Sequence, residues 1–142
     1  DDLHERAGST KVLHLHGEIK KSRSSVTQES YPIKGFELNL GDKCPKNSQL
    51  RPDVVWFGEA VPNMVKAMEL CKDADYLLII GTSLTVYPAA NLIEFVPDSC
   101  ARFLIDPNTI NTSGIKNLTI INKKASIGIP ILANNLLKSI TT

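Results

Sequence analysis

Short apolar runs alternate with segments of helical periodicity along most of the chain, and this alternation restricts the possible fold most strongly. The run DYLLII is continuously apolar, as in a central strand that is covered on both faces. Strands that alternate with helices form βαβ units, so we expect an α/β fold with a parallel sheet flanked by helices. The apolar runs predict strands at residues 12–15, 53–57, 75–80, 102–105 and 118–121.

Three segments have the periodicity of helices, and one long segment has no period. Met64 and Met68 lie on one apolar stripe at helical spacing, so we interpret them as core residues and not as ligands. Residues 20–49 are rich in Ser, Lys, Asn and Gly, which predicts a long excursion out of the sheet. The predicted helices cover residues 62–71, 88–96 and 126–140.

Composition limits the classes of partner. With 142 residues and 42% hydrophobic content, the chain is long enough for one core, so we expect one domain or part of one. Lys and Arg number 16 against 15 Asp and Glu, a balance that argues against nucleic acid or a membrane surface as partner. Cys44, Cys71 and Cys100 lack C-x-x-C spacing, which argues against a disulfide framework and favours the cytoplasm.

The chain opens on DDLHERAGST, with charged residues and no initiator methionine, and we therefore expect it to be a fragment of a longer protein. The first twenty residues lack the apolar core of a secretory signal. The longest apolar run, residues 76–80, is too short to cross a bilayer, so we expect a soluble chain.

Two histidines, His14 and His16, stand two residues apart in the segment VLHLHGEI. On a strand they would share one face, which permits a metal pair. Zinc needs about four ligands, however, and neither a cysteine pair nor another histidine lies nearby in the sequence. We therefore interpret His14 as a hydrogen-bonded structural ring. His16 lies at the predicted strand exit, where its ring can reach a ligand.

The residues that end the predicted strands have a common chemistry. Ligands of open parallel sheets bind beyond the carboxyl ends of the strands. Glycine there allows close approach of the backbone, hydroxyls suit phosphate or ribose oxygens, and a carboxylate suits a pair of ribose hydroxyls. Plain helix capping, and a solvated charge at Glu59, are the alternatives. Together these residues predict a nucleotide site: His16-Gly17, Gly58-Glu59, Gly81-Thr82-Ser83 and Asp106-Pro107-Asn108.

Six segments, in this order and at roughly this spacing, resemble the sirtuins, the NAD-dependent protein-lysine deacylases of the silent information regulator type. They are DDLHERAG, LHLHGE, LRPDVVWFGE, GTSLTVYPAA, FLIDPN and KASIGIP. The resemblance is closest to bacterial members and covers the carboxyl-terminal part of the catalytic domain. It implies a Rossmann-like domain with a small inserted module at about residues 20–49, in which NAD and an acyl-lysine meet between the two. The implied products are nicotinamide and O-acyl-ADP-ribose.

The resemblance also implies roles for single residues on the NAD side. His16 matches the catalytic histidine, which takes a proton from a ribose hydroxyl, a task that suits an imidazole ring. Asp106 stands where the family often has an asparagine on the adenine-side ribose. The other matching NAD-site residues are Asp1 and Val54 at the nicotinamide pocket, Gly81, Thr82 and Ser83 after the central strand, and Ala125 next to adenine.

On the substrate side, Val55 matches the residue whose carbonyl accepts the acyl-lysine N–H, and Trp56 matches the lining of the tunnel. Core packing is the alternative for both. The substrate peptide would lie by β-strand addition between two segments. Their matching residues are Gly58 and Glu59 on one side, and Val86 and Tyr87 on the other.

Two departures from the family qualify these expectations. The usual first C-x-x-C pair is replaced by KSRSSVTQ and Cys44 stands alone, so we expect no zinc. The amino-terminal NAD-binding half is absent from the sequence, so we expect residues 1–142 alone to be inactive and to expose an apolar sheet edge that promotes oligomers. The alternatives to a deacylase are an NAD or ADP-ribose binding module without turnover and a mono-ADP-ribosyltransferase.

Overall fold

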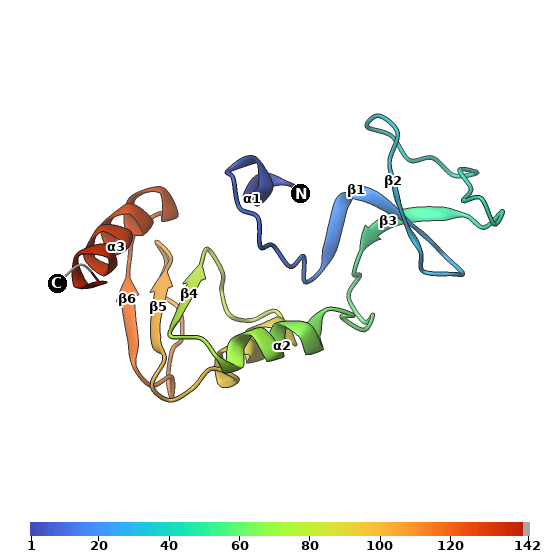
Figure 1. The fold of residues 1–142 in the computed structure, drawn as a ribbon. Coiled ribbons are helices and arrows are strands. Elements are labelled where there is room, and N and C mark those ends of the chain that lie inside the picture. Colours follow the sequence, from blue (N-terminus) through green and yellow to red (C-terminus); the bar gives the residue numbers. More distant parts are fainter. Residues whose placement is uncertain (141–142) are drawn as a thin grey trace. The chain divides into compact units, whose positions relative to one another are not determined.

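The computed structural model describes residues 1–140, which form two compact units (Figure 1). The first unit comprises residues 1–63, and the second begins at Met64.

The first unit contains a short helix and an antiparallel sheet. The strand order is β2-β1-β3, and β1 pairs with both neighbours. The pairing of β1 with β3 shifts between Glu18 and Ser22, where the strands are irregular. The elements are α1 (Leu3–Arg6), β1 (Gly17–Ser24), β2 (Ser30–Pro32) and β3 (Leu50–Val54).

Both strands predicted in this unit are wrong in position. Residues 12–15 are irregular, and the strand begins only at Gly17. The second strand is Leu50–Val54 instead of 53–57, and neither belongs to the parallel sheet. Part of the predicted excursion at 20–49 lies in β1 and β2. These strands contain few apolar residues and show no regular alternation of apolar and polar residues. Backbone pairing and polar side chains stabilise them, and not an apolar face.

Gly17 is required by a close approach within this sheet. Its φ is +87°, and a Cβ there would lie 2.1 Å from the carbonyl oxygen of Asp53. We expected this glycine to allow close approach of a ligand. Instead, it allows close approach of the backbone of Asp53 in the neighbouring strand.

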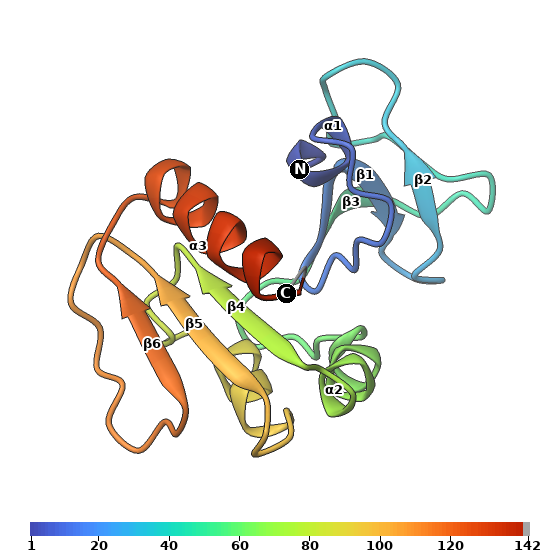
Figure 2. The same cartoon turned by 60° about the vertical axis from the view of Figure 1, so that its left-hand side comes forward.

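The second unit contains the predicted parallel sheet, in the order β4-β5-β6. In Figure 2, α3 lies in front of this sheet and η1 behind it. The α/β class and the last three predicted strands are therefore confirmed. The elements are α2 (Met64–Lys72), β4 (Tyr76–Ile80), η1 (Ala89–Glu94), β5 (Ala101–Ile105), β6 (Leu118–Ile121) and α3 (Ala125–Ile140).

The helices of the second unit follow the predicted order with one change of type. The predicted helix at 88–96 is a single 3₁₀ helix that ends at Glu94. Met64 and Met68 are half-buried, which agrees with packing. No helix among residues 1–140 is long and apolar enough to cross a membrane. The buried apolar residues of this unit are Ala67, Ile79, Val96, Cys100, Leu104, Ile105 and Leu132.

Strand β4 was predicted to be central, and this prediction is wrong for the described residues. Within residues 1–140, β4 pairs only with β5 and so lies at the sheet edge. Leu78 and Ile80 are 38% and 40% exposed. A continuous apolar run indicates that a strand suits burial on two faces, but it does not give the number of neighbouring strands.

Candidate functional site

The predicted site residues fall into two groups, one in each unit. In the first unit, His16 lies just before β1 and its ring is exposed. The ring makes no hydrogen bond with any residue in the described range. The backbone carbonyl of His16, however, accepts a hydrogen bond of 2.9 Å from the amide of Val55. This bond holds the proposed base next to the segment that follows β3.

His14 is the hydrogen-bonded structural ring that the sequence predicted. Its Nε2 lies 2.7 Å from Oε1 of Glu5 in α1, and the side chain is 19% exposed. Its carbonyl accepts a hydrogen bond from the side-chain amide of Asn63. Residues 12–15 form no strand, so strand alternation does not place the two histidines on one face as expected.

Asp1 lies with His14 and Gly17 around a shallow hollow of about 480 Å³. Oδ1 of Asp1 accepts a hydrogen bond from the amide of Leu3 at the start of α1. The adjacent Asp2 forms an ion pair of 2.6 Å with Lys20 in β1, which ties the start of the chain to the sheet. The first unit therefore holds Asp1 beside the segment that leads to His16.

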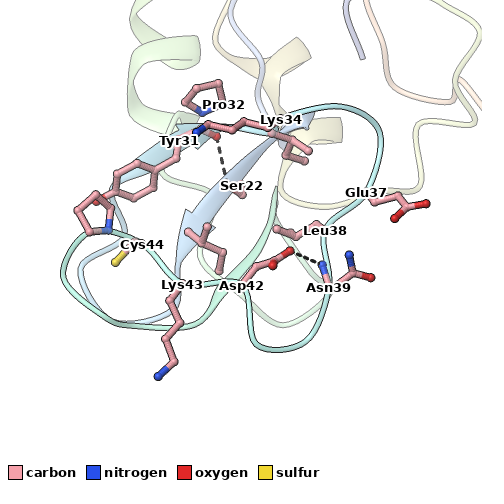
Figure 3. Close-up of a pocket in the computed structure, with 13 residues that line it drawn as sticks. Ser22, Tyr31, Pro32, Lys34, Glu37, Leu38, Asn39, Asp42, Lys43 and Cys44 are labelled. Atoms are coloured by element: carbon pink, nitrogen blue, oxygen red, sulfur yellow. Dashed lines mark hydrogen bonds between the residues drawn. The ribbon is translucent and has the colours of Figure 1, made fainter.

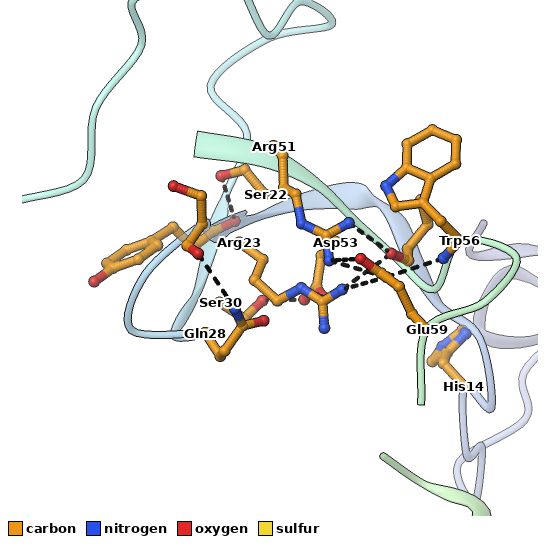
Figure 4. Close-up of polar contacts among 12 residues, drawn as sticks. His14, Ser22, Arg23, Gln28, Ser30, Arg51, Asp53, Trp56 and Glu59 are labelled. Carbon is orange, nitrogen blue, oxygen red and sulfur yellow. Dashed lines mark hydrogen bonds and ion pairs between the residues drawn. The ribbon is translucent and has the colours of Figure 1, made fainter. Parts of the chain in front are cut away.

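The segment from Val54 to Glu59 is held by its own backbone and by side chains from the sheet (Figure 4). Trp56 donates its amide hydrogen to Oε2 of Glu59 at 3.0 Å, and Glu59 donates its own to the carbonyl of Trp56 at 3.0 Å. The Trp56 side chain is 54% exposed and Gly58 is exposed as well. Trp56 is therefore not a core residue, whereas Val55 is half-buried.

Glu59 is exposed, but it is not the unpartnered loop charge that was the alternative prediction. Its two carboxylate oxygens accept hydrogen bonds from Nη2 of Arg51 at 2.8 and 3.0 Å. The amide of Trp56, followed by Arg51, holds the pKa of Glu59 below its usual range. Arg51 and its neighbour Arg23 were not among the predicted site residues. Arg51 and Glu59 stand at the two ends of the segment LRPDVVWFGE, and opposite charges there are compatible with an ion pair. Their spacing in the sequence alone does not show that the two side chains meet.

In the second unit, the carboxyl ends of the parallel strands meet at one edge, as predicted. Ile80 of β4 pairs with Ile105 of β5, which pairs with Ile121 of β6. The residues that follow these strands therefore share that edge, and Asn122 donates a side-chain hydrogen bond to the carbonyl of Asn108 across it. The predicted residues at this edge are Gly81, Thr82, Ser83, Asp106 and Ala125.

Asp106 is buried, with 8% of its surface exposed. Its Oδ1 accepts hydrogen bonds from the backbone and side-chain amides of Asn108, at 2.8 and 3.1 Å. Its Oδ2 has no donor among the described residues. One carboxylate oxygen thus fixes the group and the other is left to accept hydrogen bonds from a ligand, such as ribose hydroxyls.

A cleft of about 490 Å³ lies beside Asp106, and Ser83 and Tyr87 help to line it. The hydroxyl of Ser83 lies 2.6 Å from that of Thr85, and the hydroxyl of Thr82 accepts a hydrogen bond from the amide of Leu84. Val86 and Tyr87 are 44% and 68% exposed. The cleft combines hydroxyls, amides and one carboxylate, a donor set that suits a nucleoside.

The small-module segment contains a cavity of about 790 Å³ with Cys44 on its wall (Figure 3). Sγ of Cys44 lies 3.0 Å from the hydroxyl of Ser48, which is 2.6 Å from that of Ser24. The hydrogen bond with Ser48, supported by nearby backbone amides, lowers the pKa of Cys44 to about 7.

These groups do not fit a zinc site. Ser24 and Ser48 are hydroxyl residues, whereas zinc in proteins takes thiolates, imidazoles or carboxylates. Within residues 1–140, no group of three or more His, Cys, Asp or Glu side chains is arranged to hold a metal ion. Cys44, Ser48 and Ser24 form a hydroxyl–thiol cluster, and Ser24 belongs to the segment KSRSSVTQ that replaces the usual first cysteine pair.

Comparison with known proteins gives consistent matches. The family model of the Sir2 family matches residues 1–88. An NAD-dependent protein deacylase of Bacteroides thetaiotaomicron is 43% identical over an aligned stretch of 144 positions that covers 96% of this chain and 61% of that protein. A deacylase of the same description from Helicobacter pylori is 49% identical over 125 residues, 88% of this chain and 55% of that protein.

Solved structures match as well. The crystal structure of a Sir2 homolog–NAD complex has a TM-score of 0.84 at 36% identity and covers 98% of this chain and 56% of that chain. The structure of Sir2Tm bound to a propionylated peptide has a TM-score of 0.74 at 27% identity, covering 94% and 60%. The chain thus spans little more than half the length of these relatives. Since the family model and the relatives match most of its residues, the chain belongs to the Sir2 family.

Proposed function

We propose that the protein to which this chain belongs removes acyl groups from protein lysines with NAD as co-substrate. Two kinds of relative support this: proteins named NAD-dependent protein deacylases, and Sir2 structures with NAD or with a propionylated peptide. With one water, the reaction would transfer the acyl group to ADP-ribose and release nicotinamide and the free lysine amine, so the enzyme would be a transferase in outcome.

In the first unit, His16 would act as the general base. The acyl oxygen attacks the anomeric carbon as nicotinamide leaves, and the ring of His16 takes the proton of a ribose hydroxyl. The ring is exposed and has no hydrogen-bond partner within residues 1–140, so it is available for this task. Asp1 and Val54 would contact the nicotinamide end, and the carbonyl of Val55 would accept the acyl-lysine N–H. Trp56, Gly58 and Glu59 would border the substrate.

In the second unit, the edge at Gly81, Thr82 and Ser83 and the free oxygen of Asp106 would bind the adenosine half of NAD, with Ala125 next to the adenine. The burial of Asp106 and its fixed Oδ1 support this assignment. Val86 and Tyr87 would line the second side of the substrate peptide.

The observation that carries the proposal is the hydrogen bond between the Val55 amide and the His16 carbonyl. Through this bond of 2.9 Å, His16, the proposed proton acceptor, lies next to Val55, whose carbonyl is the proposed acceptor of the acyl-lysine N–H. A nucleotide-binding module without turnover needs no such pairing. Two alternatives, binding without turnover and ADP-ribosyl transfer, are distinguished by products.

The test is His16→Ala in the full-length protein, with NAD and an acetyl-lysine peptide. We expect turnover to fall about 10²–10⁴-fold, while the Kd for NAD changes little. His14→Gln is the control and should lower stability, not the rate per folded enzyme. Mass spectrometry should find nicotinamide and O-acyl-ADP-ribose. ADP-ribosylated protein as the main product, or unaltered turnover in His16→Ala, would contradict the proposal.

Three further proposals accompany this one. A bacterial origin is supported by the bacterial relatives, and a cytoplasmic location by three free cysteines. The absence of zinc is supported by the hydroxyl–thiol cluster and would be checked by elemental analysis of tag-free protein. Self-association of the isolated chain through the β4 edge is supported by the exposure of Leu78 and Ile80.

A further inference from the structure

Two arginines from neighbouring strands converge on the end of β3. Nη2 of Arg23 and Nη1 of Arg51 both donate to the carbonyl of Val54, at 3.1 and 3.2 Å. Arg51 also binds both oxygens of Glu59, and Nη2 of Arg23 lies 3.5 Å from Oε2 of the same residue. We call Arg23, Arg51 and Glu59 the arginine clamp (Figure 4).

The clamp is partly buried and imperfectly satisfied. The side chain of Arg23 is 11% exposed and that of Arg51 is 23% exposed. Nε of Arg23 is buried and has no hydrogen-bond partner among residues 1–140, and a carboxylate oxygen of Asp53 lies 3.6 Å away. Burial of a guanidinium is costly unless every donor is paired. An unpaired donor in such a place calls for a role other than stability.

The clamp fixes two successive peptide planes. The carbonyl of Val54 and the amide of Val55 belong to one planar group, which is held at its oxygen by two arginines and at its nitrogen by the carbonyl of His16. In the next plane, the amide of Trp56 is held by Oε2 of Glu59. Because a trans peptide directs its C=O opposite to its N–H, this bond also sets the direction of the Val55 carbonyl.

The Val55 carbonyl is the group that this arrangement leaves open. The carbonyl of Trp56 accepts from the amide of Glu59, whereas the carbonyl of Val55 has no donor among the described residues. A carbonyl with a fixed direction and no internal partner is a prepared acceptor for an N–H group supplied from outside.

We propose that Arg51 and Arg23 are positioning residues that act through Glu59 to fix the Val55 carbonyl as the acceptor of the acyl-lysine N–H. This inference rests on the proposed function for the identity of the donor. Glu59 borders the substrate and, in addition, orients the acceptor by holding the amide of Trp56. In this role the two arginines need no contact of their own with the substrate.

The first test is kinetic and uses the full-length enzyme. Arg51→Gln should raise the KM for an acetyl-lysine peptide about tenfold or more, with the KM for NAD within twofold of wild type. Arg51→Lys should behave similarly, because a lysine keeps the charge but cannot bind both oxygens of Glu59 and the Val54 carbonyl in one fork. Lys46→Gln, which breaks the ion pair of Lys46 with Glu29 in the same unit, is the charge-matched control and should leave both KM values unchanged.

The second test does not depend on catalysis. Trp56 is the single tryptophan of the chain, so its fluorescence reports on this segment alone when the full-length protein's other tryptophans are replaced. Arg51→Gln and the isosteric Glu59→Gln should lower the fluorescence anisotropy of Trp56, and Lys46→Gln should not. If wild type shows no deacylation, the proposed function fails, and this arm still decides whether the clamp orders the segment. An unchanged anisotropy, or a wild-type peptide KM in Arg51→Gln or Arg51→Lys, would overturn the inference.

Discussion

Different interactions stabilise the interior of each of the two units. In the described part of the second unit most buried residues are apolar, with Leu104 1% and Ile105 0% exposed, and the buried polar residues there are Arg102 and Asp106. In the first unit the buried residues are Ser22, Arg23, Ser24 and Cys44. Apolar burial is strong but non-directional, whereas hydrogen bonds are weaker and directional.

This difference suits the roles that we propose. The second unit offers strand ends on a packed parallel sheet, which is a stable platform for a nucleotide. The first unit must hold two peptide planes near His16 in fixed directions, and the arginine clamp does so through hydrogen bonds. A mainly apolar core could not specify the direction of a single carbonyl.

The largest effect that this comparison predicts is in the second unit. Leu104→Ala should lower its free energy of unfolding by ~2–5 kcal/mol, because a fully buried leucine leaves a cavity. Hydrogen exchange read by mass spectrometry should speed up in β4, β5 and β6 and not in β1 or β3. Leu70→Ala, at a position that is 63% exposed on α2, is the control. Equal loosening of both units would show that they are one cooperative system.

The next effect is in the first unit and comes from geometry. Gly17→Ala should lower the free energy of unfolding of the first unit by ~2–4 kcal/mol. The new Cβ would overlap with the carbonyl of Asp53, and alanine would also be strained in the left-handed conformation of this residue. Gly35→Ala is a matched control: its φ is +84°, close to that of Gly17, but nothing lies within 4 Å of its Cβ position. Hydrogen exchange of β1 and β3 measures the difference. Equal effects of both variants would mean that backbone strain alone decides.

The same contrast explains what the sequence could predict. Residues 75–80, 102–105 and 118–121 were predicted as strands because an apolar core selects apolar runs, and the structure confirms them. In the first unit the strand GEIKKSRS contains few apolar residues. Its pairing with β3 depends on hydrogen bonds, which the periodicity of the sequence does not indicate. The apolar residues 12–15 therefore suggested a strand where none exists.

The candidate site divides in the same way. The strand ends of the second unit could be predicted to meet, because the carboxyl ends of parallel strands share one edge. The arginine clamp could not, because Arg23 and Val54 are far apart in the sequence and meet only across antiparallel strands. The role of His14 as a structural ring was predicted correctly, but its partner Glu5 was not.

A third, smaller effect tests whether hydroxyls support the first unit. The hydroxyl of Ser24 accepts hydrogen bonds from the amides of Val26 and Thr27, at 3.2 and 3.0 Å, and Ser24 is fully buried. Ser24→Ala should cost ~1–3 kcal/mol because the amides of Val26 and Thr27 and the hydroxyl of Ser48 lose a hydrogen-bond partner. Ser25→Ala, at the exposed neighbouring position, is the control. If both variants were equally stable in thermal unfolding, hydroxyl bonding would not be what holds this module.

The smallest effect concerns pH, and it should appear in the first unit before the second. Asp2, Glu5, Glu29 and Glu59 have lowered pKa values, and all four lie in the first unit. Hydrogen bonds from Lys46 and Tyr31 lower the pKa of Glu29 to about 2, from its ordinary 4.5. Between these values the unfolded chain binds more protons than the folded chain, so stability is full above pH 4.5 and falls as the pH drops towards 2.

We therefore expect exchange protection around β2 to decline between about pH 4.5 and 2 while that of β5 persists. The decline should be modest, because these carboxylates are exposed and salt screens them, and high salt should reduce it further. Glu29→Gln has no titrating group at this position, so its protection around β2 should depend less on pH than that of wild type. Protection factors corrected for intrinsic exchange are the measurement. Earlier loss in β5 than in β2 would reverse the comparison and show that the apolar unit is the weaker of the two in acid.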